Sequence, residues 1–212
     1  MLTRFFSLLL CAALTAALAS CDTTPTTDTD TDMAADSSAV DAMPQGIMNA
    51  GALPSGEQFS TTSLDDTLAS PRLQMEGNLA GSKIIVNYGS PGVKGRTIWG
   101  ELVPFDRVWR TGANEATVVT FEKDVLVDGK PLKAGSYALF TVPGQENWTV
   151  IFNKTTEQWG AYDYSDKDDV LTVTVAPRPA DKEAEHLYFG LEDNELTLHW
   201  SDLIVPVKLQ AA

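Results

Sequence analysis

The chain has 212 residues, of which 43% are hydrophobic. This content suits one or two globular domains and is too low for a multi-span membrane protein. The formal net charge is −14 at pH 7, from 29 acidic residues against 15 scattered lysines and arginines. Because no basic patch can neutralise phosphates, the composition argues against nucleic acid as a partner and against a membrane surface bound through charge alone.

The first 20 residues have the organisation of a lipoprotein signal peptide. Arg4 and the free amino terminus form a positive head, and residues 5–19 form an apolar run broken by two hydroxyl residues. A run of this length is short for a membrane span and suits the core of a signal peptide. It ends in Leu-Ala-Ser followed by Cys21, which resembles the lipobox of bacterial lipoproteins. In that motif the cysteine thiol is alkylated by a diacylglycerol before the leader is cleaved.

Cys21 is therefore predicted to be the lipid-bearing first residue of the mature protein. The acyl chains would anchor it to a bilayer of the cell envelope, facing the periplasm or the cell exterior, since each buried methylene contributes about 0.8 kcal/mol. The other cysteine, Cys11, lies in the leader, so the mature protein has no disulfide and its core alone must hold the fold. The alternative is an ordinary secretory signal with a coincidental cysteine. The small residues before Cys21 favour lipidation.

Residues 21–69 are predicted to be the lipid anchor followed by a disordered acidic tether. From residue 22 to residue 75, eight aspartates and Glu57 face only Arg72. Threonine, serine, alanine and glycine make up most of the rest, and the few apolar residues follow no helical or strand period. Such a composition cannot bury enough apolar surface to offset the entropy of the chain.

Residues 70–209 are predicted to form a single all-β domain. Short β-rich runs alternate here with turn residues such as Asp128-Gly129, and no long amphipathic helix is present, although one helical turn could form at 104–109 or 155–159. Many short strands at this spacing favour an antiparallel β-sandwich, jelly-roll-like in type, over a helical or parallel α/β fold. The candidate strands are 73–76, 82–88, 117–121, 125–127, 136–142, 148–152, 170–175, 186–189, 196–200 and 203–209.

Common catalytic and metal-binding signatures are missing from the sequence. There is no nucleophile elbow of the Gly-x-Ser-x-Gly type, no phosphate-binding loop and no dinucleotide fingerprint. His186 and His199 each fall in a predicted strand without a His or Cys partner at ligand spacing, so no metal or cofactor is expected. Four aspartates between residues 163 and 169 could attract Ca²⁺, but the EF-hand glycine and terminal glutamate are absent, which predicts a solvated acidic loop.

Two glycine-punctuated segments place aromatic rings beside hydrogen-bonding and charged side chains. They are residues 93–117 and 153–164, and this combination suits a polar small molecule or a sugar ring. The competing interpretation is structural, because a Trp-Arg-Glu cluster can also close one end of a sandwich over a partly buried ion pair. The candidate binding residues are Arg96, Trp109, Arg110, Asn114, Glu115, Lys154, Trp159 and Tyr162.

Four segments of the domain, at residues 88–96, 109–117, 132–137 and 159–162, also carry a family resemblance. The second of them reads Trp-Arg-Thr-Gly-Ala-Asn-Glu-Ala-Thr. Together these segments resemble the domain of unknown function family 2911, over about residues 70–209. The resemblance implies an exported protein, in agreement with the leader, and it brings no established activity.

Three classes of function remain open at this point. The preferred hypothesis is a non-catalytic binding module that presents a pocket to an envelope glycan, a polar small molecule or a protein. The alternatives are a structural or assembly lipoprotein that acts through a protein interface, and a carboxylate-dependent hydrolase that uses Glu115 with Arg110 as its electrostatic partner. The hypotheses differ in whether Arg110, Asn114, Glu115 and Tyr162 meet at one open cleft.

Overall fold

The structure is a computed structural model that describes residues 51–52 and 58–212. The predicted signal peptide, Cys21 and most of the predicted tether lie outside these residues. Within the described part of the chain, no helix is long and apolar enough to cross a membrane.

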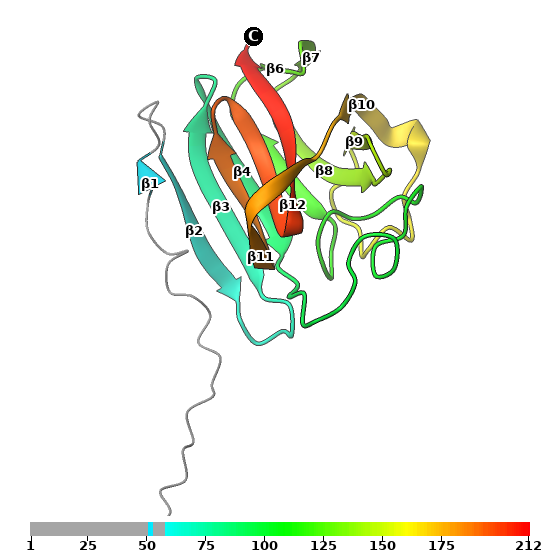
Figure 1. The fold of residues 1–212 in the computed structure, drawn as a ribbon. Coiled ribbons are helices and arrows are strands. Elements are labelled where there is room, and N and C mark those ends of the chain that lie inside the picture. The colour runs from blue at the N-terminus through cyan, green and yellow to red at the C-terminus, as the bar shows by residue number, and fades with distance from the viewer. Residues whose placement is uncertain (1–50, 53–57) are drawn as a thin grey trace, which may run out of the picture. The chain divides into compact units, whose positions relative to one another are not determined.

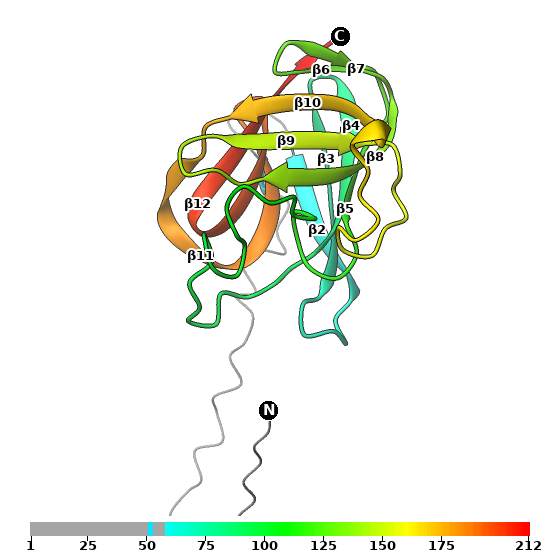
Figure 2. The same cartoon turned by 90° about the vertical axis from the view of Figure 1, so that its right-hand side faces the viewer.

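Two antiparallel sheets pack face to face, so the predicted β-sandwich is confirmed (Figure 1). The larger sheet contains, in spatial order, β1 (Gly51–Ala52), β2 (Gln58–Asp65), β3 (Arg72–Leu79), β4 (Ser82–Gly89), β5 (Thr117–Phe121), β8 (Gly135–Val142), β9 (Trp148–Asn153) and β10 (Asp169–Val175). The smaller sheet contains β11 (Arg178–Glu192), β12 (Glu195–Ala211), β6 (Val125–Val127) and β7 (Lys130–Leu132). Neighbouring strands are mostly consecutive in the chain, and Figure 2 shows that the β6–β7 hairpin sits near the end of β12.

Strict alternation along the central strands sets which side chains face the core. In β4, Ile84, Val86 and Tyr88 are buried, whereas Asn87 between them is half-exposed on the opposite face. Successive side chains of a strand point to opposite faces of its sheet, so this pattern gives β4 an inner apolar side and an outer polar side. On β8 and β9 the outer face is apolar instead, because Ala138, Phe140 and Ile151 form a second buried cluster there. The register places Asn87 opposite Val118 on that outer face.

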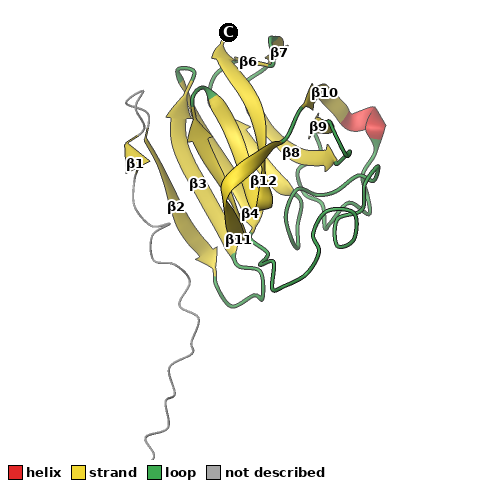
Figure 3. Ribbon diagram, viewed as in Figure 1, coloured by secondary structure: helices red, strands yellow, loops and turns green. Residues whose placement is uncertain are grey.

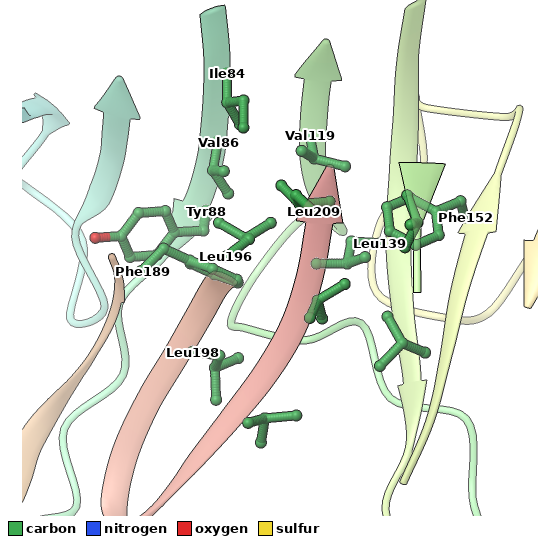
Figure 4. Packing of buried hydrophobic residues seen from close by; sticks show 14 of the residues in the cluster. Ile84, Val86, Tyr88, Val119, Leu139, Phe152, Phe189, Leu196, Leu198 and Leu209 are labelled. Atoms are coloured by element: carbon green, nitrogen blue, oxygen red, sulfur yellow. The ribbon is translucent and has the colours of Figure 1, made fainter. Parts of the chain in front are cut away.

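The core lies between the two sheets. Figure 4 shows Val86 and Tyr88 of β4 facing Leu196 of β12 and Phe189 of β11. The ring centroids of Tyr88 and Phe189 are 4.9 Å apart in an edge-to-face contact. Such aromatic pairs contribute roughly 0.5–1.5 kcal/mol beyond the area that they bury, so this contact helps to join the two sheets.

The larger sheet extends beyond the predicted domain boundary at residue 70. Residues 58–65, which the prediction assigned to the tether, form β2 and pair with β3, with Thr61 opposite Met75. The segment is rich in threonine and serine, and this polar composition concealed a strand that lies between β1 and β3 and pairs with both through its backbone.

Three further features differ from the sequence prediction. Within the described residues the only helix is a short 3-10 turn, Asp166–Asp168, and neither 104–109 nor 155–159 is helical (Figure 3). The predicted strands 196–200 and 203–209 both lie in β12, which folds back near Ser201, where φ is 53°, so that the N–H of Leu209 donates to the carbonyl of Asn194 at 2.8 Å. The β7 strand, which contains Pro131, was not predicted, since proline is uncommon inside strands.

A long connection between β4 and β5, residues 90–116, crosses one end of the sandwich. Three isolated bridges fasten it to other segments: Gly92 with His186, Trp109 with Thr141, and Glu115 with Trp159. Trp109 and Thr141 exchange two backbone hydrogen bonds of 2.7 and 2.9 Å. This connection carries most of the candidate binding residues, so these bridges determine where they lie.

Candidate functional site

Four of the five tryptophans pack into one cluster beneath the long connection. Trp99 and Trp109 come from residues 90–116, Trp148 from β9 and Trp200 from β12. Trp109 stacks on Trp200 with ring centroids 5.8 Å apart, and Trp99 meets Trp148 edge-on at 4.9 Å. Trp109 is only 9% exposed. It therefore serves as core and as a pocket wall, and it is not a free stacking platform.

A small cavity, here called the arginine pocket, opens beside this cluster. Its volume is about 240 Å³. It is lined by Ser70, Pro91, Arg96, Leu102, Val103, Trp109, Arg110, Gly112, Ala113, Asn114 and Trp200. Asn114 is anchored there because its side-chain amide donates a hydrogen bond to the carbonyl of Ser70 at 3.1 Å.

The guanidinium of Arg110 lies half-buried in this pocket without a counter-charge. No carboxylate of the described residues lies within 4 Å of it, and its Nε is buried without a hydrogen-bond partner. Burial without compensation lowers the pKa of Arg110 from its ordinary value, and the nearby phenol of Tyr162 opposes this shift. Arginine nevertheless stays protonated in proteins, so the pocket contains a permanent positive charge.

A second and larger concavity, here called the sheet groove, lies on the outer face of the larger sheet. Its volume is about 530 Å³. It is lined by Arg72, Asn87, Glu115, Ala116, Val118, Thr120, Ser136, Thr156, Glu157, Gln158 and Trp159. Neighbouring strands provide its floor, where the hydroxyls of Thr120 on β5 and Ser136 on β8 are 2.8 Å apart. Amide and hydroxyl groups therefore share the groove lining with the apolar side chains of Ala116 and Val118.

The loop between β9 and β10 forms one wall of the sheet groove. Figure 2 shows this loop, in yellow, running beside β5 and β8. The backbone N–H of Ala116 donates to the carbonyl of Gln158 at 3.0 Å, and the N–H of Gly160 donates to the carbonyl of Asn114 at 3.1 Å. These bonds hold Trp159 at the groove with 59% of its surface exposed.

An ion pair crosses one end of the sheet groove. Arg72 donates to Oε2 of Glu115 at 2.7 Å, and the side chain of Glu115 remains 40% exposed. The pair leaves the other carboxylate oxygen of Glu115 without a protein partner among the described residues. Glu157 is a second carboxylate in the groove lining.

The structure divides the eight candidate residues between several places. Arg96, Trp109, Arg110 and Asn114 line the arginine pocket, whereas Glu115 and Trp159 line the sheet groove. Lys154 pairs with Asp168 at 3.1 Å, and Tyr162 is 86% exposed and lines neither cavity. Arg110, Asn114, Glu115 and Tyr162 therefore do not share one cleft.

Sequence reasoning missed several residues that line the two cavities. In the sheet groove these are mainly Asn87, Thr120 and Ser136, and in the arginine pocket Trp200. The outward positions in the alternation of β4 and β5 were a usable signal for the groove. No comparable signal pointed to Trp200, because only the tertiary structure brings it beside the residues of the long connection that line the pocket.

Asp169 of the acidic loop and His199 are occupied by internal contacts. Asp169 accepts hydrogen bonds from the hydroxyl of Tyr164 at 2.7 Å and from the amide of Asn153 at 2.9 Å. His199 stacks on Tyr188 with centroids 4.4 Å apart, and burial lowers the pKa of His199 to about 4. In the described part of the chain no group of three or more His, Cys, Asp or Glu residues could hold a metal ion.

Comparison with known proteins identifies a family and no activity. A family model described as "Protein of unknown function (DUF2911)" matches residues 70–209. No curated protein and no solved structure matches the chain. A function must therefore be argued from the geometry of the two cavities.

Proposed function

Because the chain belongs to the DUF2911 family, which is described without an activity, we propose its function from the site. The domain is a non-catalytic binding module, and the sheet groove binds a polar, polyhydroxylated ligand of the glycan class. The observation that carries this proposal is an exposed indole, Trp159, held at the edge of a floor that includes amide and hydroxyl side chains.

The exposure of Trp159 is unusual within this protein. The other four tryptophans lie in the cluster at the end of the sandwich, whereas Trp159 exposes 59% of its surface to solvent beside the groove. Binding pockets combine aromatic surface with a few placed polar groups that orient the ligand. A sugar ring matches this arrangement, because its apolar face can stack on the indole while its hydroxyls reach Asn87, Thr120 and Ser136.

The groove favours binding over hydrolysis. Glycoside hydrolysis requires one protonated carboxyl group that donates to the leaving oxygen, with a second carboxylate beside it. Glu115 is already occupied, because Arg72 donates a hydrogen bond to its Oε2 at 2.7 Å. The Arg72–Glu115 pair instead offers a charged donor and a charged acceptor to the hydroxyls of a bound ligand.

The predicted lipid anchor determines where the groove is displayed. In this proposal the acylated thiol of Cys21 holds the domain on a bilayer of the cell envelope, and the ligand is an envelope or extracellular glycan. Mass spectrometry of the mature amino terminus tests the anchor, with an acylated Cys21 expected. A mature chain that begins at any other residue would remove the proposed location and leave the groove to be tested separately.

Calorimetric titration with neutral glucan-, mannan- and chitin-derived oligosaccharides tests the ligand class. At least one series is expected to bind, and Trp159→Ala is expected to weaken that binding about tenfold, because a central aromatic contact contributes about 1–2 kcal/mol. Tyr162→Ala is the matched control, since this aromatic residue of the same loop is exposed and lies outside the groove lining.

Two results would count against the binding module. If no oligosaccharide binds, or if Trp159→Ala and Tyr162→Ala weaken binding equally, the groove is not the glycan site. Release of new reducing ends during the titration, abolished by Glu115→Gln, would instead identify a hydrolase.

A further inference from the structure

A second site is present at the end of the sandwich, separate from the sheet groove. We propose that the arginine pocket binds a small organic carboxylate, with Arg110 as the main anion-binding residue. This inference does not depend on the glycan proposal, because Asn87, Trp159 and the rest of the groove lining contribute nothing to the pocket.

Arg110 has a positive charge that no carboxylate compensates. Of the five arginines in the described residues, Arg72 and Arg178 form ion pairs with glutamates at 2.7 and 2.8 Å. Arg96 and Arg110 both line the arginine pocket and have no carboxylate of the described residues within 4 Å. Arg96 is exposed, whereas Arg110 is partly buried, and a partly buried arginine without a carboxylate partner leaves room for an anionic ligand.

Within the described residues the guanidinium of Arg110 forms no hydrogen bond, and its Nε is sealed from solvent without a partner. Buried donors without partners are rare in native proteins, and the terminal nitrogens of Arg110 are the donors left for a ligand in the cavity. Arg96 differs, because its guanidinium donates to the backbone carbonyls of Gly92 and Val93. Arg110 is therefore the arginine best placed to donate hydrogen bonds to a bound anion.

The size and lining of the pocket narrow the ligand. A volume of about 240 Å³ lies below the roughly 300–1,000 Å³ of pockets for drug-sized ligands. Leu102, Val103 and Trp109 supply apolar surface beside the arginines. A planar carboxylate matches the guanidinium fork with two parallel hydrogen bonds, and a short organic group attached to it would contact the apolar wall. A bare phosphate would leave that wall unused.

The test is a calorimetric titration of the whole protein with benzoate, and with benzamide and inorganic phosphate as comparison probes. Benzoate is expected to bind, and benzamide, its neutral counterpart, at least tenfold more weakly. Arg110→Gln is expected to weaken benzoate binding by about tenfold or more, since hydrogen bonds to charged groups are the stronger class. Arg107→Gln is the matched control, because Arg107 is exposed and lies outside the pocket lining.

Four results would overturn the inference: no binding of benzoate, equal binding of benzamide, unchanged affinity in Arg110→Gln, or tighter binding of phosphate than of benzoate. If Arg110→Gln melts well below the parent protein, Arg110→Lys replaces it, and the loss of the planar fork is still expected to weaken benzoate binding. The Trp159→Ala variant should bind benzoate normally, so failure here and failure of the glycan proposal give distinguishable results.

Discussion

His199 should make the protein less stable in mild acid. Burial lowers the pKa of its imidazole from 6.5 to about 4, with a further contribution from the positive charge of Arg178. Glu192 lies 3.4 Å from Nε2, but burial outweighs the attraction that its carboxylate would exert on a protonated ring. The folded protein therefore holds His199 neutral, stacked on Tyr188 and within 3.0 Å of the hydroxyl of Thr197.

The sign and size of the effect follow from proton linkage. Between pH 6.5 and about 4, the unfolded chain binds a proton that folded His199 does not bind, so the free energy of unfolding falls as the pH falls. At 1.36 kcal/mol for each unit of pKa difference, the loss approaches about 3 kcal/mol across this window. Burial raises the pKa of Glu192, which acts in the opposite direction, since protonation of that carboxyl favours the folded state as the pH falls.

Urea denaturation followed by tryptophan fluorescence, at intervals from pH 7 to pH 4.5, measures this dependence. The difference between the parent protein and His199→Gln isolates the histidine, and the same comparison in a Glu192→Gln background removes any coupling between the two groups. His186→Gln is the matched control, as the only other histidine of the chain. Parallel curves for the parent protein and His199→Gln would refute the reasoning.

Two further predictions concern the residues that build the candidate site. Trp148→Ala should lower the free energy of unfolding by about 3–5 kcal/mol, because it leaves a cavity within the tryptophan cluster. Trp159→Ala, at the exposed rim of the groove, should change the free energy of unfolding by less than about 0.5 kcal/mol. Urea denaturation measures both values, and equal effects would contradict the assignment of Trp148 to the core and Trp159 to the rim. A double-mutant cycle on Arg72 and Glu115 should give a coupling energy below about 1 kcal/mol that decreases with added salt, since both side chains remain partly exposed. A larger coupling energy that does not depend on salt would contradict this prediction, because it would indicate an ion pair buried from solvent.

The strands of the sandwich were largely predictable because their signal is local. Alternation along β4 and the turn at Asp128-Gly129 follow from rules that act within a few residues. The β2 strand was missed because its threonines and serines bury little surface, and it is held by hydrogen bonds to β3. The continuity of β12 was missed because its bend at Ser201 interrupts the alternation on which the prediction relied.

The candidate site was only partly predictable because the sequence does not show whether a given tryptophan or arginine is buried. Trp109 and Trp159 were selected for the same reason, yet one is a core residue and the other is exposed. Asn114 and Glu115 are adjacent in the chain but line different cavities. Asn114 has a φ of 62°, a left-handed conformation that asparagine tolerates better than most residues, and the chain changes direction there.

The amino-acid sequence by itself determined the all-β class, most strand positions, the family and the absence of cysteine from residues 22–212, because each depends on composition or short-range order. Only the tertiary structure decided that Arg72 pairs with Glu115 across 43 residues of chain, that four tryptophans pack together while Trp159 is exposed, and that Arg110 has no carboxylate partner among the described residues. Each of these depends on which distant segments the two sheets bring together. Whether a side chain is buried, and whether its charge is compensated, is decided by neighbours that are far away in the sequence.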